Sequence, residues 1–194
     1  MWRRIALVSL AVLAVALSAA GDEGAEPAPA AEITDADDQF WRGFNLLNGR
    51  GVERDVAQST LWFRRAAEQG HMRSQVHLGM AYLMGRGVEI DPALALEWLV
   101  KAADQGHPKA QFEAGVLYLE GRGVQRDQAE GAKWMLMSLL AGGPLPRAKV
   151  PTYLKGIPLP QFREGQARAR AWRVERGLPL PEARKRDASE TADP

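Results

Sequence analysis

Apolar and polar residues along the chain follow a pattern that repeats every 36 positions, from about residue 38 to residue 142. Glycine, leucine and alanine recur in phase, and so does the rare residue tryptophan, at Trp62, Trp98 and Trp134. Inside each period the apolar positions are spaced i, i+3, i+4 and i+7, as a helix with one buried face requires. The pattern therefore predicts amphipathic helices in three copies of one structural unit.

Each copy is predicted to contain two helices joined by a short turn. The first helices are expected at 37–48, 73–84 and 109–120. The sequence Gly-Arg-Gly-Val follows each of them, and its glycines supply the positive φ angles that end a helix. The second helix should begin after an aspartate that caps its free N–H groups and should end at a glycine. These residues are Asp55, Asp91 and Asp127, and Gly70, Gly106 and Gly142.

A single helix pair cannot bury both of its apolar faces, so neighbouring copies must stack. We therefore predict an all-α fold, a right-handed α-solenoid of three 36-residue helix-turn-helix repeats at 38–70, 74–106 and 110–142, together spanning 38–142. The 36-residue pattern fails after Gly142, and residues 143–178 are predicted to form C-terminal capping helices. The last helix, from about Pro160 to Arg176, has a narrow apolar stripe that includes Trp172.

Both ends of the chain differ in composition from the repeats. An apolar stretch from Ile5 to Leu17 follows two arginines and precedes small residues, so residues 1–20 are predicted to be a signal peptide cleaved after Ala20. This predicts a periplasmic or secreted protein, and an uncleaved membrane anchor is the alternative. Residues 21–37 and 179–194 contain few large apolar side chains and are predicted to be a disordered linker and a disordered tail.

Composition removes several kinds of chemistry. Lysine and arginine number 25 and aspartate and glutamate 24, so the net charge of +1 gives no reason to expect a nucleic-acid partner. The absence of cysteine excludes disulfides and thiolate metal sites. Three histidines, His71, His77 and His107, have no metal-binding spacing, and no catalytic or phosphate-binding motif is present. We therefore expect no metal, no cofactor and no enzymatic activity.

The second copy carries the most complete motif, with Ser74-Gln75, Leu78-Gly79, Tyr82, Gly85, Gly87-Val88, Asp91, Ala95, Trp98, Ala102-Ala103 and Gly106. In these residues the chain resembles the Sel-one-like repeat family, a relative of the tetratricopeptide repeats. The third copy departs from the family at Gly131, Ser138 and Leu139, and the first at Arg42 and Leu46. The resemblance implies an α-solenoid scaffold that assembles or regulates other proteins. Some cysteine-rich members are associated with β-lactamase activity or penicillin binding, but this chain lacks those cysteines.

Positions that vary between the copies but share one helix face are free to specify a ligand. On the first helices these positions hold Trp41, Asn45, Asn48, His77, Ala81, Met84, Glu113, Leu117 and Glu120. The resemblance implies that first helices line the inner surface of a superhelix. Their mixture of aromatic, amide and carboxylate groups suits a protein or peptide partner, bound by a chain that we expect to be monomeric.

Two other functions are compatible with the sequence. The chain could be a cell-envelope enzyme that acts on peptidoglycan or a β-lactam through Glu113 or Glu120. It could also be a module that contacts an anionic envelope surface through the arginines of the last helix, namely Arg163, Arg168, Arg170, Arg173 and Arg176. Apart from that helix and an uncleaved anchor, no segment is expected to contact a membrane.

Overall fold

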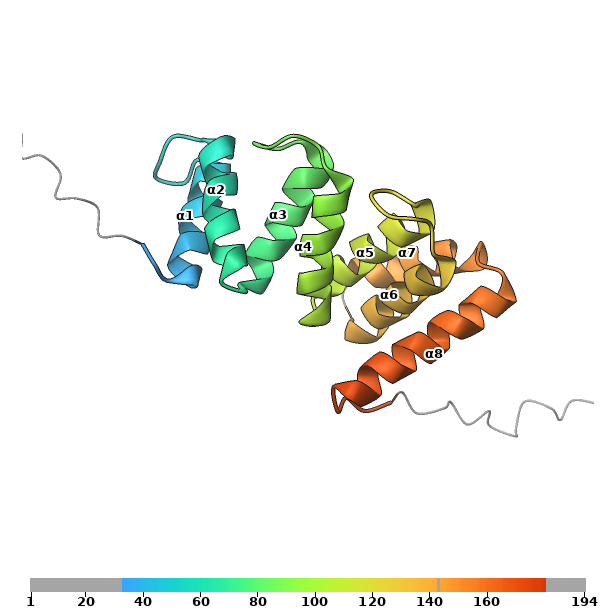
Figure 1. Cartoon of the computed structure of the whole chain (residues 1–194). Helices are drawn as coiled ribbons and strands as arrows, with labels where there is room; N and C mark the ends of the chain where they lie inside the picture. The colour runs from blue at the N-terminus through green and yellow to red at the C-terminus, as the bar shows by residue number, and fades with distance from the viewer. Residues whose placement is uncertain (1–32, 143, 181–194) are drawn as a thin grey trace, which may run out of the picture. The chain divides into compact units, whose positions relative to one another are not determined.

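The computed structural model of the protein describes residues 33–142 and 144–180. Within these ranges the chain forms eight α-helices and no β-strand (Figure 1). The helices are α1 (Ala36–Asn48), α2 (Val56–Glu68), α3 (Met72–Met84), α4 (Pro92–Asp104), α5 (Pro108–Glu120), α6 (Gln128–Ala141), α7 (Pro144–Lys155) and α8 (Leu159–Glu175). The predicted all-helical fold with three paired units is confirmed, and each first helix begins one residue before its expected start.

The predicted end segments lie mostly outside the described residues, including the whole predicted signal peptide (1–20). The predicted linker (21–37) ends too late, because α1 begins at Ala36. Asp35 caps this helix, and its Oδ1 accepts hydrogen bonds from the N–H groups of Asp37 and Asp38 at 2.9 and 3.1 Å. At the other end, the carbonyl of Pro179 accepts a hydrogen bond from Arg173 Nε at 2.9 Å, so the predicted tail is held at its first residue.

The turns inside the units have the predicted caps. At the end of α3, Gly85 has a φ angle of 66°, which a residue with a side chain rarely adopts, and its N–H donates to the carbonyl of Ala81. At the start of α4, Asp91 Oδ1 accepts from the N–H groups of Ala93 and Leu94 at 2.9 and 3.0 Å. Asp55 and Asp127 cap α2 and α6 in the same way. Local sequence therefore fixes where the first helix of a pair ends and where the second begins.

Within a unit, the two helices approach closely at a glycine of the first helix. A Cβ atom on Gly79 would lie 2.7 Å from Leu99 Cγ and 3.1 Å from the carbonyl oxygen of Ala95. In the first unit the hydroxyl of Ser59 donates to the carbonyl of Gly43 at 2.7 Å, which joins the two backbones. Small residues are needed here because any larger side chain would separate the helices.

Glutamine side chains reinforce the packing within and between units. The side-chain amide of Gln69 donates to Gln39 Oε1 at 2.9 Å, and that of Gln105 donates to Gln75 Oε1 at 2.7 Å. Each acceptor lies on the first helix of a unit, and each donor follows the second helix of the same unit. Gln75 and Gln111 also donate to backbone carbonyls of the preceding unit, at 3.2 and 3.0 Å. Buried amides are thus used to hold consecutive helices in position.

The helical periodicity continues beyond the predicted end of the repeats. Pro144, the first residue of α7, lies 36 residues after Pro108, the first residue of α5. The sequence motif fails there, yet α7 keeps the phase of a fourth first helix and packs against both α5 and α6. Its Val150 is fully buried with Phe112 and Met135.

The last helix, α8, packs along α6 and closes the C-terminal end of the helical stack, as predicted for a capping helix. Gly165 allows the close approach, because a Cβ there would lie 2.6 Å from the Cβ of Ala132. Trp172 is buried against Trp134, and its indole N–H donates to Asp104 Oδ1 at 2.9 Å. The cap is therefore attached to both the second and the third unit.

Candidate binding face

The structure divides the nine predicted binding residues by accessibility. Four are exposed, namely Trp41, Asn48, Met84 and Glu120, and three are half-buried, namely Asn45, His77 and Glu113. Ala81 and Leu117 are only 5% and 1% exposed, so their side chains are not available to a partner. Leu117 packs in the main apolar core with Ala114 and Trp134. These two residues were predicted to bind because their positions vary between the copies, but their apolar side chains could have indicated burial.

An aromatic cluster lies at the N-terminal end of this face. Trp41 is 50% exposed, and its ring contacts Phe40 and Phe44 edge-on, with centroid distances of 5.3 and 5.6 Å. The guanidinium of Arg50 lies over the second of these rings, 5.2 Å from the Phe44 centroid. Phe44 and Arg50 were not among the predicted site residues. Phe44 follows Trp41 by three residues, a helical spacing that could have suggested it, whereas Arg50 lies beyond the end of α1.

His77 joins the first unit to the second through ring stacking. Its imidazole is parallel to the Phe63 ring, with centroids 4.5 Å apart and an interplanar angle of 15°. Burial lowers the pKa of His77 from 6.5 to about 4, and Lys109 and His107 add to the effect. The ring is therefore neutral near pH 7, and it serves as an aromatic packing group as well as part of the surface.

The C-terminal part of the face is charged. Burial raises the pKa of Glu113, while Lys109 and Lys149 oppose that shift by favouring the carboxylate. Lys149 is supplied by α7, which the sequence pattern did not assign to this face. Glu120 lies 3.5 Å from Arg122, measured between carboxylate oxygen and guanidinium nitrogen, and both side chains are about half exposed. The face thus changes from aromatic in the first unit to charged in the third.

Three consecutive segments of the chain, residues 36–71, 73–107 and 108–143, match the family model described as the Sel1 repeat. The chain belongs to the Sel1 repeat family. Each matched segment contains one helix pair, α1–α2, α3–α4 or α5–α6, so the resemblance noted in the second copy extends to all three. No curated protein matches the chain.

Solved structures of other Sel1 repeat proteins share the fold. A Sel1 repeat protein from Oxalobacter formigenes is 34% identical and covers 61% of this chain and 90% of its own, with a TM-score of 0.57. The protein c5321, a protective antigen present in uropathogenic Escherichia coli strains that displays an SLR fold, is 32% identical, with a TM-score of 0.57. That match covers 76% of this chain but only 35% of c5321.

The third Sel1 repeat departs from the second where α6 meets the C-terminal helices. Ser138 and Leu139 stand where the second repeat has Ala102 and Ala103. Ser138 is buried, and its hydroxyl donates to the carbonyl of Pro108 at 2.7 Å. Leu139 is 37% exposed, whereas Ala103 is fully buried. The third repeat therefore has a partly exposed apolar side chain at a position that is buried in the second repeat.

Two of the three histidines cap helices in the Sel1 repeats. His71 Nδ1 accepts from the N–H of Ser74 at 3.1 Å, and its Nε2 lies 3.0 Å from a carboxylate oxygen of Asp37. His107 Nδ1 accepts from the N–H of Ala110 at 3.3 Å. Across residues 33–142 and 144–180, no three His, Cys, Asp or Glu side chains gather as a metal site requires.

Among residues 33–142 and 144–180, no helix is both long enough and apolar enough to cross a bilayer.

Proposed function

We propose that the protein is an exported Sel1 repeat scaffold that binds a protein or a peptide through its first helices. The surface concerned, called the helix-A face below, consists of the accessible predicted residues Trp41, Asn45, Asn48, His77, Met84, Glu113 and Glu120. Ala81 and Leu117 support this face from below and do not contact the partner. The single observation that carries the proposal is the environment of Trp41.

Trp41 combines a large accessible surface with a fixed position. Half of its surface is exposed, while edge-on contacts with Phe40 and Phe44 restrict its ring. Tryptophan side chains that are held in this way are frequent binding hot spots, because a large apolar area is buried with little loss of side-chain entropy. Met84 is 48% exposed in the next unit and is a second exposed apolar side chain among the helix-A residues.

The remaining residues favour an extended partner over a small molecule. The accessible groups come from α1, α3 and α5, and they change from aromatic to charged along the helical stack. A peptide or a helix of another protein can satisfy such a gradient with apolar residues at one end and basic residues near Glu113 and Glu120 at the other. Three repeats offer a short surface, so a transient contact of modest area is expected.

A pull-down from an extract of the expressing cell, with the purified protein as bait, tests the proposal. The variant Trp41→Ala/Met84→Ala/Glu120→Ala removes three exposed side chains from the helix-A face. Its matched control, Leu61→Ala/Glu68→Ala/Glu97→Ala, removes three exposed side chains from α2 and α4. We expect the first variant to lose the partner and the control to keep it, with equal helicity by circular dichroism. A first variant that keeps the partner, or a control that loses it, would contradict the proposal.

Export has a separate test. The apolar stretch from Ile5 to Leu17, with Ala20 at its end, supports cleavage by a signal peptidase. N-terminal sequencing of the protein from the expressing cell should begin at Gly21, in the periplasm or in the medium. A cytoplasmic protein that retains residue 1 would refute export.

A further inference from the structure

The C-terminal end of the helical stack contains a groove, and the arrangement of the last two helices explains it. In each Sel1 repeat the two helices pack against each other along their length, as α5 and α6 do. In the described part of the chain α7 and α8 scarcely contact each other, and α8 packs against α6 instead. One face of α6 is therefore left open beside α8.

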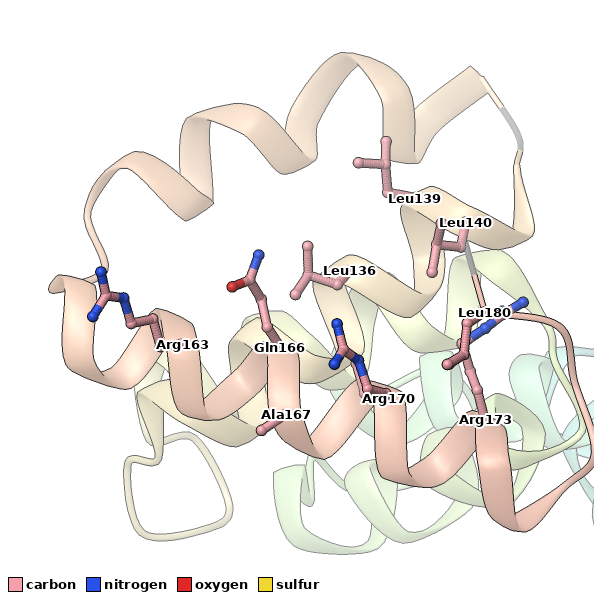
Figure 2. A pocket seen from close by; sticks show the side chains of 10 residues that line it. Leu136, Leu139, Leu140, Arg163, Gln166, Ala167, Arg170, Arg173 and Leu180 are labelled. Atoms are coloured by element: carbon pink, nitrogen blue, oxygen red, sulfur yellow. The ribbon is translucent and has the colours of Figure 1, made fainter. Parts of the chain in front are cut away.

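Leucines form the floor of this groove. Leu136, Leu139 and Leu140 rise from α6, and Leu180 lies at one end (Figure 2). Leu139, Leu140 and Leu180 are 37%, 44% and 44% exposed, and the groove has a volume of about 410 Å³. The second repeat has Ala103 and Asp104 at the positions of Leu139 and Leu140. The third repeat thus places large apolar side chains where nothing in the described structure covers them.

Arginines form the edge of the groove. Four polar residues of α8 follow one another at intervals of three, four and three residues, so they share one face of the helix (Figure 2). They are Arg163, Gln166, Arg170 and Arg173. Arg173 binds the carbonyl of Pro179, which places Leu180 at the end of the groove. No carboxylate pairs with Arg163 or Arg170 among residues 33–142 and 144–180.

Two further arginines, Arg168 in α8 and Arg176 directly after it, have structural roles. Arg168 lies 2.8 Å from Asp127, 3.2 Å from Glu130 and 2.5 Å from Glu164, and Arg176 lies 3.0 Å from Asp104. The pairs with Asp127, Glu130 and Asp104 attach α8 to α6 and α4, whereas the pair with Glu164 lies within α8. The arginines at the groove are therefore distinct from those that hold the helix, and their charge is available to a ligand.

We propose that this groove binds an amphipathic, acidic helix of a partner protein. The leucines of α6 are spaced i, i+3 and i+4, which matches the apolar ridge of another helix. Glutamate or aspartate residues beside that ridge would face Arg163 and Arg170 and supply the missing opposite charge. The chain's own segment 181–194 is a poorer complement, because it contains no large apolar residue and carries three basic residues together.

Fluorescence anisotropy with a synthetic peptide tests the inference. The probe is a helix of roughly 18 residues, five turns, with leucines at i, i+3, i+4 and i+7 and glutamates beside them. One control peptide has lysine in place of glutamate, and another has the same composition in scrambled order. We expect the acidic helix to bind the purified protein about tenfold or more tightly than either control.

Variants assign the binding to the groove. Arg163→Glu/Arg170→Glu should weaken binding of the acidic peptide about tenfold or more and should improve binding of the lysine peptide. Arg42→Glu/Arg86→Glu makes the same change in net charge at exposed positions elsewhere and should have no effect. Leu139→Ser/Leu140→Ser should also abolish binding, while the Trp41 triple variant should bind normally. This last result separates the groove from the helix-A face.

Three results would overturn the inference. The first is equal affinity for the acidic and scrambled peptides, or affinity that does not depend on Arg163 and Arg170. The second is displacement of the acidic peptide by a synthetic peptide of residues 181–194, which would assign the groove to the chain's own tail. The third is binding to vesicles of anionic phospholipid that depends on Arg163 and Arg170, without binding of the acidic helix.

Discussion

A missing hydrogen bond in the third unit leads to a stabilising substitution. Each unit has a buried glutamine on its first helix: Gln39, Gln75 or Gln111. In the first two units a second glutamine, 30 residues later, donates a hydrogen bond to it, at 2.9 Å from Gln69 to Gln39 and at 2.7 Å from Gln105 to Gln75. Ala141 occupies the corresponding position in the third unit. Gln111 is 1% exposed, and its Oε1 has no hydrogen-bond partner within the described part of the chain. Ala141→Gln should supply the missing donor.

The expected gain follows from the burial of Gln111. A buried acceptor without a partner costs about 1–3 kcal/mol, and a new hydrogen bond contributes about 1 kcal/mol on its own. Ordering the added glutamine side chain costs up to about 2 kcal/mol. We therefore expect the free energy of unfolding to increase by about 1 kcal/mol, which corresponds to a rise in Tm of about 2–4 °C for a domain of this size.

Thermal and urea unfolding, followed by far-UV circular dichroism, measure the effect. Ala141→Glu is the matched control, because it has the same length but an ionised carboxylate has no hydrogen to donate. In a Gln111→Met background, Ala141→Gln should bring no gain, since the acceptor is absent. Equal stabilisation by Gln and Glu, or an undiminished gain in the Gln111→Met background, would refute the hydrogen-bond explanation.

Two further substitutions test the packing. Burial lowers the pKa of His77 to about 4, so at pH values between 6.5 and 4 the unfolded chain binds a proton that the folded chain does not, and stability falls with falling pH. His77→Phe keeps a ring against Phe63 but cannot bind a proton. The loss in free energy of unfolding as the pH falls from 6.5 to 4, measured by urea titration, should therefore be smaller in this variant by on the order of 2–3 kcal/mol. An unchanged pH dependence would contradict this explanation. Gly165→Ala should destabilise the docked α8 by about 1–3 kcal/mol, because the new Cβ would lie 2.7 Å from the carbonyl oxygen of Ala129. Hydrogen exchange in α8 measures this, and Gly156→Ala, where the nearest atom is 3.8 Å away, should show no acceleration.

Local signals explain why so much of the fold could be predicted. The aspartate caps, the glycine turns and the helical spacing act over a few residues, so each helix pair is specified by its own segment. Asp91 and Gly85 lie where these signals predicted. Each first helix was predicted to start one residue too late, because its N-cap was not recognised: Asp35 stands in an acidic segment, and His71 and His107 follow a glycine that ends the preceding helix.

Tertiary packing explains what the sequence pattern missed. The α7 helix keeps the 36-residue phase although Pro151 replaces the glycine of the motif, Gly115, so its place depends on contacts with α5 and α6. Ala81 and Leu117 were assigned to the binding face because they vary, but the helix packing buries them. The groove beside α8 could not be predicted, since it arises from the separation of two consecutive helices.

Site-specific photo-cross-linking tests the central claim, that the helix-A face contacts a partner. A photoreactive amino acid is placed singly at Trp41, Met84 or Glu120, and at the exposed control positions Leu61 and Glu97. The protein is irradiated in the cell that expresses it. We predict that one partner protein is cross-linked from the three helix-A positions and not from the two controls. Cross-links from Leu61 and Glu97 alone, or from all five positions equally, would contradict the account.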